Sequence, residues 1–118
     1  MPYKHAAHID AIFGQIIVKH RTHAGLDQAA LADRLNLHQP ALSRLERGES
    51  PANMSMLVRL SVALGVPAAR LITEFEAALV KLRSEDIKVA SKKELSKDSS
   101  GLALALLGGA ALAFLISR

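Results

Sequence analysis

The chain has 118 residues, of which 50% are hydrophobic and only 3% aromatic, and it contains no cysteine. This length suits one small domain with an appendage and leaves no room for a second, catalytic domain, while the lack of cysteine excludes disulfide scaffolds and thiolate-bound metals. Fifteen Lys and Arg against eleven Asp and Glu give a net charge of +4, which favours an anionic partner without naming one.

The sequence divides into three parts of different composition. Residues 1–83 are predicted to form a globular helical unit, because apolar residues recur there at steps of three and four, as from Ile9 to Ile17. Residues 84–100 are rich in lysine and serine and are expected to form a charged linker or a helix extension. Residues 101–118 form a hydrophobic tail. No stretch alternates as a strand does, which favours an all-α class.

Local signals divide the first part into five helices. Gly25 is suited to ending the first helix, Asp27 and Asn53 to capping the second and fourth, and Pro40 and Pro67 to opening the third and fifth. The expected helices run over about residues 5–22, 28–35, 40–47, 54–64 and 68–83. Two short helices joined by a tight turn, within a set of five, indicate a helix-turn-helix.

The residues from Gly25 to Leu71 carry a recurring pattern of this kind. They include GLDQAALADRL, then QPALSRLERG, then LVRLSVALGV. This pattern resembles the Cro/phage-repressor (XRE-type) helix-turn-helix family over about residues 9–80. The resemblance implies a five-helix, lambda-repressor-like domain in a prokaryotic, sequence-specific DNA-binding transcriptional regulator, a repressor or an activator. Such a protein would act in the cytoplasm, as a homodimer on double-stranded DNA with a two-fold operator.

The spacing of side chains in the two short helices agrees with DNA binding. Four leucines are expected to face a shared core, with the small Ala32 where the helices cross: Leu31, Leu35, Leu42 and Leu45. The third helix then presents polar residues outward, and their types suit the major groove. Glutamine can pair with adenine, arginine with guanine and serine with either base.

The family resemblance gives these polar residues individual roles. It implies base contacts from four residues of the third helix, namely Gln39, Pro40, Ser43 and Arg44. Gln28 would bind a phosphate and brace Gln39, and Arg47 would contact the DNA backbone. Pro40 departs from the usual polar residue of the family and offers only apolar contact, for instance with a thymine methyl group.

Other residues are assigned structural roles. The resemblance pairs Arg21 with Glu46 in a partly buried ion pair, in which loss of one partner is costly. The histidine pairs His5 with His8 and His20 with His23 have metal-ligand spacing but lack matching partners, so we expect surface histidines, no metal and no cofactor. No catalytic motif is present, which argues against an enzyme.

The tail reads LALALLGGAALAFLI from Leu102 to Ile116. As one helix, residues 101–117 would extend about 25 Å, which is short for a membrane span but within the tolerated range. Four lysines precede this segment, and that charge would keep the DNA-binding domain on the cytoplasmic side. The sequence therefore favours a membrane anchor. Small residues recur every fourth position and would let two such helices pack closely: Gly101, Ala105, Gly109 and Ala113.

Two alternatives to the anchor follow from the same apolar tail. It can be an oligomerisation helix buried in a homodimer or docked on the fifth helix, or a peptide that binds a hydrophobic partner. The last case belongs to a second functional hypothesis, in which the protein is an interaction adaptor or an antitoxin-like module. The slope of DNA affinity against salt separates this hypothesis from a DNA-binding regulator.

Overall fold

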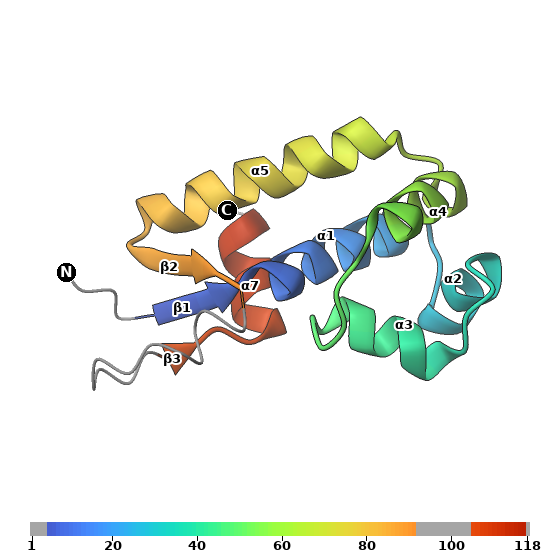
Figure 1. Cartoon of the computed structure of the whole chain (residues 1–118), viewed down its shortest axis with the longest axis horizontal. Coiled ribbons are helices and arrows are strands. Elements are labelled where there is room, and N and C mark those ends of the chain that lie inside the picture. Colours follow the sequence, from blue (N-terminus) through green and yellow to red (C-terminus); the bar gives the residue numbers. More distant parts are fainter. Residues whose placement is uncertain (1–4, 92–104, 118) are drawn as a thin grey trace.

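The structure is a computed structural model that describes residues 5–91 and 105–117. In chain order, the elements are β1 His5–His8, α1 Ile9–His23, α2 Gln28–Arg34, α3 Gln39–Glu46, α4 Met54–Leu64, α5 Ala68–Ser84, β2 Ile87–Ala90, β3 Ala105–Leu106 and α7 Gly109–Ser117 (Figure 1). The expected class is confirmed, because helices dominate and the five-helix domain is followed by a C-terminal helix.

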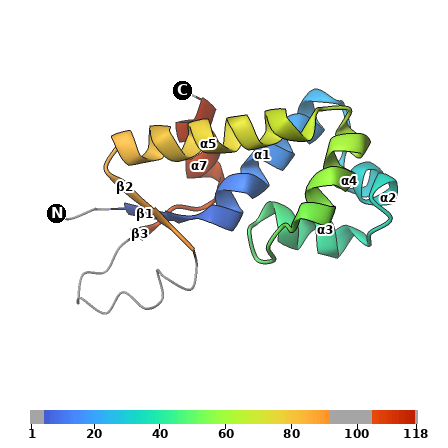
Figure 2. The ribbon, with the colours of Figure 1, turned by 45° about the horizontal axis from the view of Figure 1, so that its top comes forward.

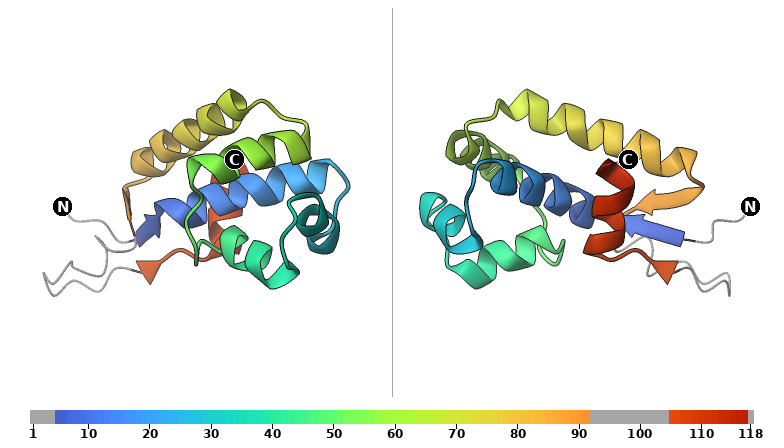
Figure 3. Two further views of the ribbon diagram at one scale, coloured as in Figure 1. Left: turned by 45° about the vertical axis from the view of Figure 1, so that its right-hand side comes forward. Right: turned by 180° about the vertical axis from the view of Figure 1, so that it is seen from behind.

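Helix α1 runs through the middle of the molecule, with α5 alongside it (Figure 1). At one end, α2, α3 and α4 gather around the C-terminal half of α1. At the other end lie the three short strands and α7, and α7 crosses the N-terminal end of α1 when seen from behind (Figure 3). One helix therefore supports both halves of the fold.

The helix ends follow the local signals in the sequence. The side chain of Asp27 accepts a hydrogen bond from the Ala30 backbone N–H at 2.7 Å, and Asn53 does the same for Met56 at 2.8 Å. The turn between α2 and α3 needs a left-handed residue, which Asn36 supplies with φ 56°. These local contacts set where the short helices begin and end.

A hydrophobic core joins α1 to α5 at the helix-turn-helix end. It is formed by Phe13, Ile16, Ile17, Leu31, Ala32, Leu35, Leu42, Leu45, Leu57, Leu60, Leu64 and Leu71. The four leucines expected in the shared core of α2 and α3 are all buried, and Ala32 is 2% exposed. Phe13 and Phe75 pack edge to face, with ring centroids 5.8 Å apart, and tie α1 to α5.

The three-stranded sheet was not expected from the sequence. β1 lies between β2 and β3 and pairs with both in parallel, His5 opposite Ile87 and Ala105 (Figures 1 and 2). The prediction that α1 begins at residue 5 is therefore wrong, because residues 5–8 are extended. Ile87–Ala90 is a strand and neither a linker nor a helix extension, whereas residues 92–100 of that segment lie outside the described part.

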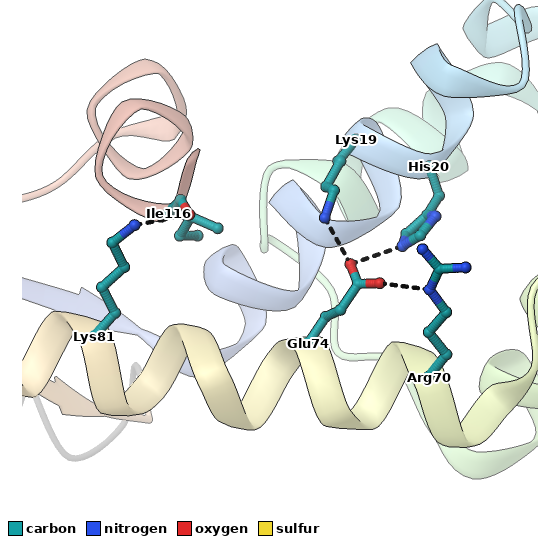
Figure 4. A network of polar contacts seen from close by, with 6 residues as sticks. All are labelled: Lys19, His20, Arg70, Glu74, Lys81 and Ile116. Carbon is teal, nitrogen blue, oxygen red and sulfur yellow. Dashed lines mark hydrogen bonds and ion pairs between the residues drawn. The ribbon is translucent and has the colours of Figure 1, made fainter. Parts of the chain in front are cut away.

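A second hydrophobic cluster fills the space between the sheet, α1, α5 and α7. Its buried members are Ala7, Ala11, Ile12, Ala78, Leu82, Ile87 and Leu112. Leu112 is fully buried, and the Lys81 ammonium donates a hydrogen bond to the Ile116 carbonyl near the end of α7 (Figure 4). Helix α7 thus docks on the helical domain, against α1 and α5.

The expectation of one continuous helix over residues 101–117 is wrong. Ala105 lies in β3, the chain is not helical at Gly108, and α7 has nine residues, or about 13 Å. The proposed stripe of small residues is therefore broken: Gly101 lies outside the described residues, and Gly109 packs toward Gln15 of α1. Among the described residues, no single helix is long and apolar enough to cross a membrane.

Two of the four histidines with metal-ligand spacing differ from the expectation of surface positions, whereas His23 is exposed as expected. His8 and His20 are each only 6% exposed, so they are not surface residues. His8 Nδ1 accepts a hydrogen bond from the Ala11 N–H and caps α1, and His20 Nε2 lies 2.9 Å from Glu74 Oε1. Within the described residues, no group of three potential metal ligands comes together. Both buried histidines have structural contacts that isolated sequence spacing does not reveal.

Glu74 of α5 is the centre of a polar network that faces α1. Its Oε1 accepts a hydrogen bond from Lys19 at 2.8 Å and contacts His20, and its Oε2 accepts one from Arg70 at 3.1 Å (Figure 4). Burial by itself would raise the pKa of Glu74, but the hydrogen bonds and charges of Lys19 and His20 lower it to about 2. The carboxylate therefore stays charged and holds α5 on α1.

We expect Glu74→Gln to change how stability depends on pH. The folded-state pKa lies below the ordinary value of about 4.3, so the stabilisation is complete above about pH 4.5 and is lost as pH falls toward 2. Denaturant unfolding should show a loss of about 1 kcal/mol at pH 7 that shrinks in this acid range, because solvent screens the exposed partners. An unchanged difference between pH 7 and 3 would contradict the assignment.

Gly14 allows the C-terminal end of α3 to pack directly on α1. A Cβ atom at this position would lie 2.1 Å from the Glu46 carbonyl oxygen and 2.9 Å from that of Leu45. Backbone atoms cannot move aside as a flexible side chain can. The orientation of α3 relative to α1 thus depends on residue 14 being a glycine, which has no Cβ atom.

We expect Gly14→Ala to lower the free energy of unfolding by about 2 kcal/mol, because overpacking outweighs the better helix propensity of alanine. Gly109→Ala is the matched control, since its Cβ would meet only the end of the flexible Gln15 side chain. Urea unfolding followed by circular dichroism measures both. Equal stability of the two variants would show that α3 does not need this close approach.

Candidate nucleic-acid interface

The outer face of α3 carries a shallow hollow of about 380 Å³. Its lining consists of Gln28, Gln39, Pro40, Ser43, Arg44 and Arg47. These are the six residues that the sequence selected for DNA contact, and α3 with the start of α2 brings them to one surface. Their contact with DNA itself remains a prediction.

The local sequence explains why these side chains face outward. Leu42 and Leu45 are buried beneath α3, so the residues between them must point away from the core. Pro40 lies in the first turn of α3, where its missing N–H costs no helical hydrogen bond. The helix is thereby held by its apolar face and leaves its polar face open to a partner.

A chain of polar contacts fixes the start of α3 relative to α1 and α2. Arg21 Nε donates to Glu46 Oε2 at 2.7 Å, and Gln28 Nε2 donates to Glu46 Oε1 at 2.7 Å. Gln39 Nε2 then donates to Gln28 Oε1 at 3.4 Å. Gln28 thus lies between the buried carboxylate and the first polar residue of α3, and within the described residues its second amide N–H has no acceptor.

Glu46 is the buried member of this chain. It is 3% exposed and Arg21 is 16% exposed, so the ion pair is partly shielded from water. Arg21 also donates to the Leu26 carbonyl at 3.0 Å, which holds the loop between α1 and α2. The arginine and glutamate that the sequence pairs therefore lie in direct contact between α1 and α3.

The two arginines of the hollow differ in their contacts. The Arg44 side chain is exposed and, within the described residues, makes no hydrogen bond or ion pair, so its guanidinium is available to a ligand. Arg47 donates to the Ser43 hydroxyl at 2.6 Å and to both carboxylate oxygens of Glu49, at 2.7 and 3.2 Å. The hydrogen bond and charge of Glu49 raise the pKa of Arg47 above its usual range.

Sequence reasoning did not single out Glu49. The signal in the sequence was its position two residues after Arg47, directly behind the glycine that follows α3. That spacing places two side chains together only when the glycine turns the chain back, as Gly48 does with φ 75°. The contact is therefore a consequence of the turn geometry and not of helical periodicity.

Fold and surface together define a helix-turn-helix domain of the DNA-binding class. A helix-turn-helix family model matches residues 17–71. The restriction-modification controller protein C.AhdI from Aeromonas hydrophila is 30% identical, with a TM-score of 0.50, and the match covers 52% of this chain and 92% of that one. The clp gene regulator ClgR from C. glutamicum is 24% identical, with a TM-score of 0.57, and the match covers 59% and 91%.

The chain belongs to the Cro/phage-repressor (XRE-type) helix-turn-helix family. It is therefore a DNA-binding transcription regulator and not an enzyme. Comparison with curated proteins gave no match. The family model matches up to residue 71, so β2, β3 and α7 lie beyond the matched residues.

We expect Arg21→Met to lower the free energy of unfolding by about 3 kcal/mol, because it leaves the buried Glu46 carboxylate without its charged partner. Arg83→Met is the matched control, since Arg83 is exposed near the end of α5. Urea unfolding of both variants measures the difference. A loss below about 1 kcal/mol for Arg21→Met would mean that solvent or Gln28 compensates the carboxylate.

Proposed function

We propose that the protein binds specific DNA sequences through the outer face of α3 and regulates transcription from them. The observation that carries this proposal is the hollow in which Gln28, Gln39, Pro40, Ser43, Arg44 and Arg47 meet on one exposed surface. A helix of this kind fits the major groove, where base edges can be distinguished. The buried Glu46 network supports the proposal, because it holds α3 rigidly.

The polar residues of α3 would divide the work of recognition. Arg44 has an unoccupied guanidinium and is suited to the two acceptors of guanine, and Gln39 is suited to adenine. Ser43 would contact either base, and Pro40 would add apolar contact with a thymine methyl group. Gln28 and Arg47 would bind phosphates, which position the protein without reading the sequence.

The same proposal includes a homodimer on a two-fold operator. One α3 contacts only a few base pairs, so two copies spaced by a helical turn are needed for a site of useful specificity. The tail is not part of a membrane anchor in this proposal, because α7 is short and Leu112 is buried in the domain. We assign the tail to stabilising α1 and α5 from outside the family fold.

We expect Arg44→Ala and Gln39→Ala each to weaken binding to a selected DNA site by about 10- to 100-fold. The loss on a random-sequence duplex should be under about fivefold, because base contacts contribute little there. The selected site is obtained from a random pool with the full-length protein, and fluorescence anisotropy measures both affinities.

Arg83→Ala is the control for this experiment, because it removes the same charge from α5, away from the hollow. It should change neither the selected nor the random affinity by more than about twofold. Equal losses on both duplexes for Arg44→Ala would show that α3 does not read the sequence. A wild-type affinity that does not depend on salt would instead support the adaptor hypothesis.

A further inference from the structure

Arg47 and Glu49 form an ion pair at the edge of the proposed DNA-binding surface. Glu49 Oε2 accepts from Arg47 Nε at 2.7 Å, and Glu49 Oε1 accepts from the terminal Nη2 at 3.2 Å. Both side chains are solvent-exposed, at 57% and 47%. The carboxylate thus engages the guanidinium by two parallel hydrogen bonds, the arrangement that a phosphate also uses.

The backbone fixes the position of this carboxylate. The Glu49 N–H donates to the Arg44 carbonyl at 2.8 Å, and the Gly48 N–H donates to the Leu45 carbonyl at 3.1 Å. These are the two hydrogen bonds of a Schellman motif. A Cβ at Gly48 would lie 2.4 Å from the Ala11 backbone nitrogen, so this turn is pressed against α1. Glu49 is therefore presented beside Arg47 by a rigid turn.

The pair also affects a neighbouring residue of the hollow. The remaining terminal nitrogen of Arg47 donates to the Ser43 hydroxyl at 2.6 Å. Thus the guanidinium has partners at all three nitrogens, whereas Arg44 has none in the described part of the chain. A DNA phosphate that binds the same edge of Arg47 must displace the Glu49 carboxylate.

We propose that Glu49 is an internal competitor for the phosphate that Arg47 contacts, and so limits the affinity of the protein for DNA. This inference rests on the proposed function, because it assumes that DNA lies over α3. Non-specific binding depends mainly on phosphate contacts. Holding Arg47 on a carboxylate reduces that binding, while the free Arg44 remains ready for bases.

The test uses the full-length protein and a random-sequence 24-base-pair duplex, with fluorescence anisotropy from about 50 to 300 mM KCl. Glu49→Gln should tighten binding about two- to fivefold near 100 mM KCl, the range for release of an exposed ion pair. The plot of log affinity against log salt should steepen by about 0.9, the value for one further phosphate contact.

Two controls separate competition from a general effect of charge. Glu76→Gln on α5 makes the same change in net charge away from α3, and it should alter affinity less than Glu49→Gln does. In an Arg47→Gln background, Glu49→Gln should lose most of its effect, because the phosphate contact is already absent. Thermal melting by circular dichroism checks that all variants are folded.

Several results would overturn the inference. If Glu49→Gln binds DNA no more tightly than Glu76→Gln, the effect comes from the change in net charge. The same conclusion holds if Glu49→Gln raises the affinity equally in the Arg47→Gln background. Weaker binding by Glu49→Gln would show that Glu49 orients Arg47 toward DNA. In each case, the proposed function still holds if wild-type binding depends on salt and Arg44→Ala loses the preference for the selected DNA site over the random duplex. Salt-independent wild-type binding would instead remove both.

Discussion

The contact between α1 and the C-terminal end of α3 is the constraint on which the proposed DNA-binding surface depends. At this point Gly14 has no side chain, and the backbone of Glu46 lies against it. The Glu46 carboxylate is buried, and among the described residues its hydrogen-bond donors are Arg21 and Gln28, which come from α1 and α2. Three helices are thus held by one carboxylate, because leaving it unpaired would cost more than ordering its partners.

α1 also packs against the other half of the fold. Its C-terminal half packs in the core of the helix-turn-helix, and its N-terminal half packs in the cluster with β2, α5 and α7. Phe75 and Ile116 pack against both clusters, so the two are continuous. The strands and α7 therefore extend the core of a small domain, whose limited size otherwise restricts the apolar area that it can bury.

Those features that depend on neighbouring residues could be predicted, and those that depend on distant contacts could not. Asp27, Asn53 and Pro40 act within one helical turn, and the helices that they begin lie where the sequence placed them. β1 could not be foreseen, because His-Ala-Ala-His has no strand pattern and becomes extended only by pairing with residues about eighty positions away. The burial of His20 could not be foreseen for the same reason, since its partner Glu74 lies on α5, 54 positions away. The sequence left the place of the tail open between a bilayer and a protein groove, because an all-apolar helix is compatible with either and composition alone does not separate them.

Within the hollow, the local sequence determines which side chains point outward but not which of them are free. Arg44 lies in the last turn of α3, Arg47 is its C-cap and both carry the same charge, yet within the described residues Arg47 has a carboxylate partner and Arg44 has none. The difference arises after the helix ends, where the left-handed Gly48 returns the chain and brings Glu49 beside Arg47. Because a fixed phosphate contact increases affinity for every sequence, an acidic residue that restrains it favours discrimination over tight binding. The free guanidinium of Arg44 is thus the one that the proposed function assigns to the bases, and the restrained guanidinium of Arg47 is the one that it assigns to the DNA backbone.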